Sequence, residues 1–405
     1  ALSLVYPIQN FANAIAIGFG IGINAMIALY LGAGDREKAE IAATHGFVLS
    51  LVHGVVMMAV SIAIMPGFLR RFTQDETLIA AGITYSTIVF LFLVVNMVSL
   101  AFEKIFQAVG RMKVSMVALI TGCVCNILLD PVLIFGLGPV PAMGIAGAAL
   151  ATGIGQVLSV VVYLVVYLRT ELPVRLRRSC LRPDAALDGR LYAIGVPAIL
   201  NLALPSLLVT FLNGLLAAFS QSYVVVLGIY YKLQTFLYLP ANGIVQGLRP
   251  IIGYNYGARK PDRVKKTIKC AMFYAEAIML VGFLLFQFLP DKLLGLFSAS
   301  EAMLAIGKPA LRIICFHFLL AGMSIILSST FQALGNGMFS LIISVCRQLV
   351  VLLPAAWLLS KTGNVNMVWW SFVIAELASV TLSFIFARLD KKIIEPMYDN
   401  AAAVQ

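Results

Sequence analysis

The sequence predicts an all-α integral membrane protein, and three observations support this fold class. Of the 405 residues, 61% are hydrophobic and 12% are charged, whereas roughly 25% of an average soluble domain is charged. Apolar runs of about 20 residues, long enough to cross a bilayer, recur along the whole chain. These runs are continuous, while a membrane β-barrel would show segments of about ten alternating residues. A water-soluble fold is therefore excluded.

Short segments rich in charge, Gly or Pro separate the apolar runs and mark where each helix ends. The first run closes at the segment GAGDRE, and the last is followed by the basic segment beginning at Arg388. We expect about eleven helices, at about residues 2–31, 42–68, 77–102, 114–136, 144–168, 191–219, 222–251, 267–289, 302–334, 338–359 and 365–387.

The Lys and Arg residues of the loops predict the orientation in the membrane. Alternate loops carry about twenty of them on one side and about five on the other. Because cytoplasmic loops carry the excess of basic residues, the rich side is cytoplasmic and so is the C-terminus. The net charge of +11 is therefore expected to face anionic lipid, and no nucleic-acid partner is predicted.

An internal repeat relates the two halves of the chain by one constant shift in residue number, here called the repeat offset. This offset aligns Gly18 with Gly243 and Gly32 with Gly257 without a gap, and it also carries the block Phe106–Ala108 onto Phe331–Ala333. Both blocks have the same orientation in the loop-charge count, which predicts a parallel repeat about an axis along the membrane normal.

Under the repeat offset, the helix at 191–219 has no partner in the first half. We therefore expect two six-helix lobes with the first of twelve helices missing from this sequence, and we expect the chain without it to be inactive or poorly folded. The predicted organisation is an N-lobe at 1–168, a cytoplasmic linker at 169–190, a C-lobe at 191–390 and a cytoplasmic tail at 391–405.

Asp130 is the leading candidate for a functional residue, because an ionisable side chain inside a span is costly and marks a site. Asn126 lies four residues earlier, on the same helix face, where its amide can donate to the carboxylate. Pro131 frees a backbone carbonyl one turn back. The pattern fits a proton-coupled carrier; the alternative is that Asp130 only bends or caps the helix.

Three other ionisable residues within spans are secondary candidates: Glu276, Glu376 and His317. Either acid could be a second protonation site, or could be buried against a basic residue such as Arg312 or Arg347. His317 titrates near neutrality but has no partner visible in the sequence. The adjacent Glu103 and Lys104 are expected to snorkel to the cytoplasmic interface.

The remaining motifs argue against an enzyme. No nucleophile elbow, phosphate loop or metal-ligand set is present, and the spacing Gly18-x-Gly20-x-Gly22 lies inside an apolar span, where it favours close helix contact. Four basic residues at or within spans, Lys232, Arg249, Arg312 and Arg347, would form a cationic face if they converged. No cofactor is predicted.

Several blocks resemble the multidrug and toxic compound extrusion (MATE) family, and most of all its DNA-damage-inducible-protein-F branch. They are GFGIGINAMIALYLGAGDREKAE at 18–40, PANGIVQGLRPIIGYNYGARKPDRVK at 240–265, NILLDP at 126–131 and GIAGAALATGIGQ at 144–156. The resemblance covers essentially the whole chain. It implies twelve helices in two six-helix lobes around a central cavity, and export of cationic or amphipathic drugs in exchange for H⁺ or Na⁺.

The resemblance also implies roles for particular residues. Asn126 and Asp130 match the Asn and Asp of a cation-coupling network on the family's fifth helix, and Tyr85 is similar to a tyrosine of that network. The family's acidic residue on helix 1 would fall in the missing segment. The spans at 191–219 and 302–334 contain no Asp or Glu, which favours H⁺ over Na⁺, and Arg249 departs from the GxQP pattern usual in the branch.

We therefore predict a multi-pass, monomeric antiporter of the bacterial inner membrane. It would export small amphipathic or cationic substrates by alternating access, coupled to H⁺ and less readily to Na⁺. The alternative within the same superfamily is a flippase of lipid-linked precursors, which a basic cavity built from Lys232, Arg249, Arg312 and Arg347 would favour. An ion channel should show a filter ring, which is absent from the sequence.

Overall fold

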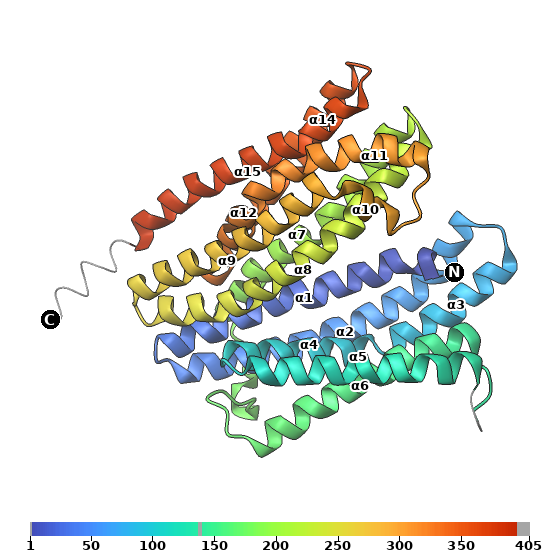
Figure 1. The fold of residues 1–405 in the computed structure, drawn as a ribbon. Coiled ribbons are helices and arrows are strands. Elements are labelled where there is room, and N and C mark those ends of the chain that lie inside the picture. The colour runs from blue at the N-terminus through green and yellow to red at the C-terminus, as the bar shows by residue number, and fades with distance from the viewer. Residues whose placement is uncertain (1, 137–139, 395–405) are drawn as a thin grey trace. The chain divides into compact units, whose positions relative to one another are not determined.

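The computed structural model describes residues 2–136 and 140–394, with side chains described to residue 388, and this part of the chain is helical without a strand (Figure 1). The first seven long helices are α1 Leu2–Gly32, α2 Arg36–Phe72, α3 Glu76–Leu91, α4 Leu93–Ala108, α5 Met112–Phe135, α6 Gly144–Arg169 and α7 Ala185–Ala217, with the short η1 Arg178–Leu181 before α7. They are followed by α8 Gln221–Gly257, α9 Pro261–Phe288, α10 Pro290–Gly295, α11 Glu301–Ile314, η2 Cys315–His317, α12 Phe318–Ala333, α13 Gly337–Val345, η3 Cys346–Leu352, α14 Leu353–Ser360 and α15 Val365–Ile394.

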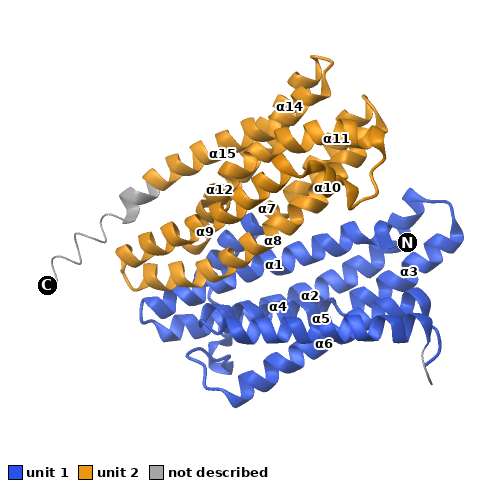
Figure 2. Ribbon diagram, in the orientation of Figure 1, with its two compact units in different colours: residues 1–199 blue, residues 200–405 orange. Residues whose placement is uncertain are grey.

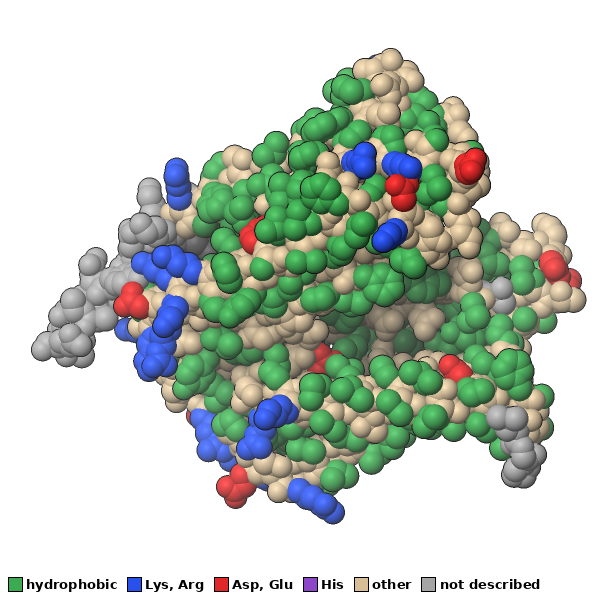
Figure 3. Space-filling view, in the orientation of Figure 1, with side chains coloured by type: hydrophobic (Ala, Val, Ile, Leu, Met, Phe, Trp, Pro, Cys, Tyr) green, Lys and Arg blue, Asp and Glu red, His purple; other side chains and the backbone are tan. Residues whose placement is uncertain are grey.

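The helices are those that the apolar runs predict. Ten helices of the described chain are long and apolar enough to cross a membrane, and the pair α3 and α4, bent by 41°, makes an eleventh if it is one span. In Figure 3, hydrophobic side chains cover the length of the helices on the face shown, and Lys and Arg side chains lie toward helix ends. An apolar exterior is the expected surface of a protein whose solvent is lipid.

Capping residues fix where several helices begin. Asp75 accepts hydrogen bonds from the backbone N–H groups of Thr77 and Leu78 at the start of α3. The Thr77 hydroxyl and these two amides hold the pKa of the Asp75 carboxyl below its ordinary value. Asp35 caps α2 in the same way, and the Lys38 amide lowers its pKa. Both aspartates satisfy N–H groups that have no partner inside their helix.

The repeat offset relates the observed helix boundaries as well as the sequence. It carries the last residue of α1, Gly32, to the last residue of α8, Gly257, and the start of α3 at residue 76 to the start of α11 at 301. The end of α4 at 108 falls on the end of α12 at 333, and α5 at 112–135 falls on 337–360, the range of α13 to α14. The helix also breaks at the same place in each repeat, at Phe92 and at Cys315–His317.

The chain divides into two units, residues 1–199 and 200–405, shown in different colours in Figure 2. The boundary lies within α7, and the segment predicted as a linker, 169–190, belongs to unit 1. In unit 1, Gly122 of α5 and Gly155 of α6 allow close packing: a Cβ on Gly155 would lie 2.7 Å from the Gly122 carbonyl oxygen. The interior of unit 2 is filled by large buried rings, among them Trp369, Tyr230 and Phe286.

The glycines of α1 have the packing role predicted for them. A Cβ on Gly18 would lie 2.5 Å from the Ile199 backbone nitrogen, and one on Gly22 would lie 2.6 Å from the Leu191 carbonyl oxygen. A Cβ on Gly20 would lie 2.8 Å from the Cγ of Lys104. Residues 391–394 continue α15, and the rest of the predicted tail, 395–405, lies outside the described residues.

Candidate functional site

The leading candidate residues lie together in unit 1, on α5 and its neighbours. The Asn126 amide Nδ2 lies 3.5 Å from Asp130 Oδ1 and 3.4 Å from the Thr152 hydroxyl of α6. The buried Tyr85 hydroxyl, from α3, lies beside Gln9 of α1 and within electrostatic range of the Asp130 carboxylate. Asp130 itself is half-buried, and no Lys or Arg of the described chain pairs with it. A carboxylate held only by neutral groups can bind a cation.

A cavity lined by several polar side chains lies beside Asn126 in unit 1. It has a volume of 210 Å³ and is lined by residues of α4, α5 and α6, including Asn96, Glu103, Asn126 and Gln156. Asn96 also donates to the Asn13 amide oxygen of α1 at 2.8 Å. A polar cavity of this size has room for several waters. The cavity therefore joins Asn126 to a second carboxylate, Glu103.

Glu103 and Lys104 are buried, so the expectation that they snorkel is wrong. Their side chains are about 7% and 5% exposed, and Lys104 Nζ lies 2.8 Å from Glu103 Oε1 and 3.0 Å from Gln107 Oε1. Gln107 Nε2 donates to Glu103 Oε1 at 2.8 Å, and Ser115 of α5 donates to the Glu103 carbonyl. The salt bridge satisfies both charges inside the unit, and neither needs to reach the interface.

In unit 2 the structure brings together two of the secondary candidates, His317 and Glu376. Glu376 of α15 lies 3.2 Å from the Arg347 guanidinium of η3 and 3.9 Å from His317 Nδ1. His317 Nε2 lies 2.8 Å from the Tyr230 hydroxyl of α8. His317 thus has the partners that its sequence context did not reveal. Of the two alternatives left open for Glu376, the structure shows burial against a basic residue, Arg347.

Glu276 of α9, the third secondary candidate, lies apart from a basic partner in the described chain and contacts the backbone of α12. Its Oε1 accepts a hydrogen bond from the Met323 N–H at 2.7 Å. A Cβ on Gly322 would lie 2.7 Å from the same oxygen, so α12 approaches this carboxylate closely only because residue 322 is glycine.

The four basic residues of the spans do not form one cationic face. Lys232 lies over the Phe297 ring at 5.7 Å, and Arg312 donates to the Gln287 carbonyl. Arg249 Nη2 donates to Gln332 Oε1 at 3.0 Å. Gln332 and Arg347 line one small pocket, and Arg347 is paired with Glu376. The basic lumen that would favour a flippase is therefore not built from these four side chains.

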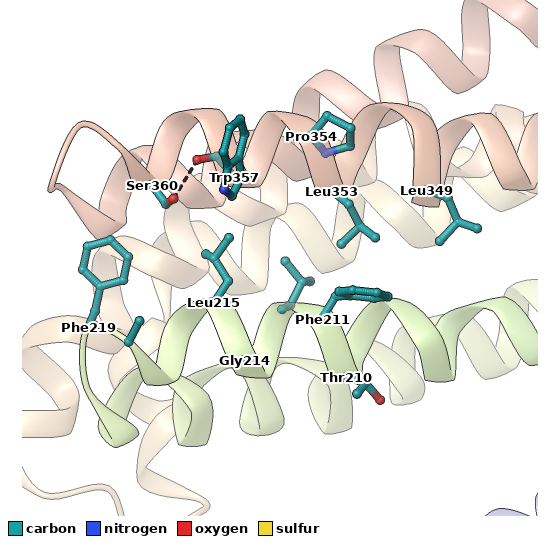
Figure 4. A pocket seen from close by; sticks show the side chains of 12 residues that line it. Thr210, Phe211, Gly214, Leu215, Phe219, Leu349, Leu353, Pro354, Trp357 and Ser360 are labelled. Carbon is teal, nitrogen blue, oxygen red and sulfur yellow. Dashed lines mark hydrogen bonds between the residues drawn. The ribbon is translucent and has the colours of Figure 1, made fainter.

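A larger apolar cavity of 880 Å³ lies in unit 2 between α7 and the segment η3–α14 (Figure 4). Phe211, Leu215 and Phe219 line one wall, and Leu353 and Trp357 line the other. Its volume is within the range of small-molecule sites. Among the described residues, no group of three His, Cys, Asp or Glu side chains is placed to hold a metal ion.

Sequence reasoning missed two contacts between polar side chains that join distant segments of unit 1. His45 of α2 lies 2.8 Å from Asp188 of α7, and Glu40 of α2 lies 2.8 Å from Arg177 in the 169–190 segment. Glu40 is buried although it stands in a charged, helix-starting sequence. Glu40 lies four residues after Arg36, and this spacing predicts only the pair that these two side chains form with each other.

Comparisons with known proteins agree with this architecture. The chain is 28% identical over 381 residues to the multidrug export protein MepA of Staphylococcus saprophyticus, covering 93% of this chain and 82% of that protein. It is 25% identical over 378 residues to MepA of Staphylococcus aureus strain MRSA252, with the same coverage. An outward-facing multidrug resistance MATE transporter of the MOP superfamily superposes with a TM-score of 0.91 at 23% identity, covering 98% of this chain and 88% of that one.

The family model described as MatE matches residues 1–132 and 197–358. These ranges contain the candidate residues of unit 1 and, in unit 2, all of the secondary candidates except Glu376. They make up well over half of the chain, and the repeat places them in corresponding parts of the two units. The chain therefore belongs to the MatE family.

Proposed function

We propose that the chain is a transporter that exports small amphipathic or cationic molecules across a bacterial inner membrane in exchange for H⁺. Membership of the MatE family and the similarity to the MepA multidrug export proteins support export of drugs over an enzymatic function. The observation that carries H⁺ coupling is Asp130. It is a carboxylate inside a membrane-spanning helix that contacts the neutral Asn126 amide and has the Tyr85 hydroxyl within electrostatic range.

The proposed mechanism follows from the weak local pairing of Asp130. When the carboxylate is charged it accepts a charge-assisted hydrogen bond from the Asn126 amide, and when it binds a proton this bond is weaker and the new O–H can donate elsewhere. Pro131 removes one backbone hydrogen bond of α5 at this point. Protonation therefore acts on a helix segment that is already less constrained. Drug and proton would each favour a different arrangement of the segment, which couples their movements.

The cavity between Asn126 and Glu103 supplies the proposed path of the proton to the cytoplasmic side. Its amide and hydroxyl groups can hold a chain of waters. The proposal includes a monomeric carrier with a cytoplasmic C-terminus, as the loop charges predict. The apolar cavity of 880 Å³ is the proposed place for the apolar body of a substrate.

Ethidium efflux tests the proposal. The full-length protein, with the first helix that the repeat predicts, is reconstituted into proteoliposomes, a pH gradient is imposed in Na⁺-free buffer, and ethidium movement is followed by fluorescence. Wild type should move ethidium against its gradient, and Asp130→Asn should lose this movement at equal protein content. Asp291→Asn, which alters an exposed pair with Lys308, is the matched control and should transport normally. Transport driven only by a Na⁺ gradient would contradict H⁺ coupling.

A further inference from the structure

Arg249 is an arginine inside a membrane-spanning helix without a counter-charge in the described chain. Its Nη2 donates to Gln332 Oε1 at 3.0 Å, while its Nε is buried and has no hydrogen-bond partner. Arg347, by comparison, has Glu376 at 3.2 Å. Removing a cation from water without an anion beside it is strongly unfavourable. The partly buried Arg249 guanidinium therefore has donors beyond its one neutral acceptor that an oxygen anion could use.

A small polar pocket adjoins Arg249 through Gln332. It has a volume of 140 Å³ and is lined by five serines, two amide side chains, one arginine and only two isoleucines. Ser340, fully buried, accepts from Asn201 at 2.8 Å and from Gln332 Nε2 at 2.9 Å, and lies 2.6 Å from Ser328. The pocket lining contains hydroxyl and amide donors and no carboxylate.

The repeat shows which side chains of unit 1 correspond to those around this pocket. The repeat offset places Glu103 of unit 1 at the position of Ser328 in unit 2, and it places Gln107 at Gln332 and Ser115 at Ser340. In unit 1 the carboxylate at this position accepts from Lys104 and from Gln107. Unit 2 keeps the glutamine and the serine, and it has a basic residue, Arg249, at the position of Asn24. Ser328 and Ser329 stand where unit 1 has Glu103 and Lys104, so unit 2 has neither charge of that pair, and Arg249 is the basic residue beside the glutamine that both units share.

We propose that the pocket beside Arg249, Gln332 and Ser328 binds a monoanionic oxyanion, a carboxylate or a phosphodiester, at the position that the Glu103 carboxylate occupies in unit 1. One unmatched positive charge calls for one negative charge, and the guanidinium and hydroxyl groups supply the donors that oxygen anions need. The oxyanion comes from a transported solute or from a lipid headgroup. In the first case the inference rests on the proposed export function and extends its substrates to molecules with a carboxylate.

A pair of dyes that differ only at this group tests the solute. Rhodamine 110 carries a free carboxylate, and rhodamine 123 is the methyl ester of the same fluorophore. Binding of each dye to the purified full-length protein in phosphatidylcholine nanodiscs is measured by fluorescence anisotropy. Arg249→Gln and Ser328→Glu should each weaken the binding of rhodamine 110 by about tenfold or more. In Arg249→Gln the charge-assisted contact is lost, and in Ser328→Glu the new carboxylate already occupies it. Rhodamine 123 should bind equally to all variants.

Arg312→Gln is the matched control, because it removes an arginine whose guanidinium contacts the Gln287 carbonyl outside the pocket. It should bind both dyes as wild type does. Ser328→Glu should also have a higher thermal unfolding midpoint than Ser328→Gln. This difference should disappear when both substitutions are made in the Arg249→Gln variant. This second measurement does not depend on ligand binding, and it remains informative if Arg249→Gln folds poorly.

Nanodiscs that also contain phosphatidylglycerol test the lipid source. If a headgroup is the occupant, phosphatidylglycerol should raise the unfolding midpoint of wild type but not that of Arg249→Gln or Ser328→Glu. Failure of wild type to bind rhodamine 123 would count against drug export and leave the lipid measurement valid. The inference is overturned if neither rhodamine 110 binding nor stabilisation by phosphatidylglycerol depends on Arg249.

Discussion

The buried pair of Glu103 and Lys104 provides the sharpest test of the packing inside unit 1. Glu103→Gln removes the negative charge but keeps the shape of the side chain. The Lys104 ammonium then remains buried with the Gln107 amide oxygen, 3.0 Å away, as its principal acceptor. Breaking a buried pair by removing one partner costs about 3 to 5 kcal/mol. Because Gln107 remains, we expect a loss near the lower limit, about 3 kcal/mol.

The double variant Glu103→Gln/Lys104→Met removes the uncompensated charge and leaves an acceptor for the Gln107 amide. Replacement of both charges is often neutral, so we expect the double variant to lose about 1 kcal/mol and to be more stable than the single one. Tryptophan fluorescence would report on the wrong unit, because all three tryptophans, Trp357, Trp369 and Trp370, lie in unit 2. Hydrogen exchange of the α4 amides is therefore the appropriate assay. A single variant as stable as wild type would refute the reasoning.

Three further predictions concern single contacts. Glu376→Gln should destabilise unit 2 by about 2 kcal/mol because Arg347, itself partly exposed, loses its counter-charge, and Glu376→Gln/Arg347→Gln should recover most of the loss in thermal unfolding followed by tryptophan fluorescence. Gly322→Ala should lower the free energy of unfolding by about 1 to 3 kcal/mol, since its Cβ would lie 2.7 Å from the Glu276 carboxylate. Gly243→Ala is the control and should not destabilise, because its Cβ would have nothing within 4 Å. Equal losses in the two variants would contradict this reasoning. At pH values above the ordinary carboxyl pKa, the Asp75 cap should protect the Thr77 and Leu78 amides from hydrogen exchange. This protection should be lost as the pH falls through the lowered pKa of Asp75. Protection that is independent of pH, or unchanged in Asp75→Ala, would contradict the prediction.

The fold could be predicted from the sequence because a bilayer leaves few choices for a backbone. Apolar length alone identified the spans, and the repeat offset agrees with the observed helix boundaries from Gly32 and Gly257 onward. The helix breaks at Phe92 and at Cys315–His317 could not be predicted, because they lie inside apolar runs with no Pro or Gly to mark them.

The candidate site was predictable where its residues share a helix face. Asn126 and Asp130 are four residues apart, and their proximity follows from helix geometry. Partners on other helices could not be found in this way. The contact of His317 with Tyr230 spans 87 residues, and that of Arg249 with Gln332 spans 83. The burial of Glu103 with Lys104 was missed because adjacent charges near a helix end usually reach the interface.

The branch of the family, the coupling ion and the position of Asp130 on the proton path remain predictions. Proton counterflow is the most direct test of them. Proteoliposomes containing the full-length protein, with the first helix that the repeat predicts, and an internal pH-sensitive dye are given an ethidium gradient in Na⁺-free buffer, with no pH gradient imposed. The account predicts that ethidium movement drives protons in the opposite direction in wild type and that Asp130→Asn abolishes the pH change. A pH change equal in Asp130→Asn and wild type, or one that appears only when Na⁺ is added, would contradict it.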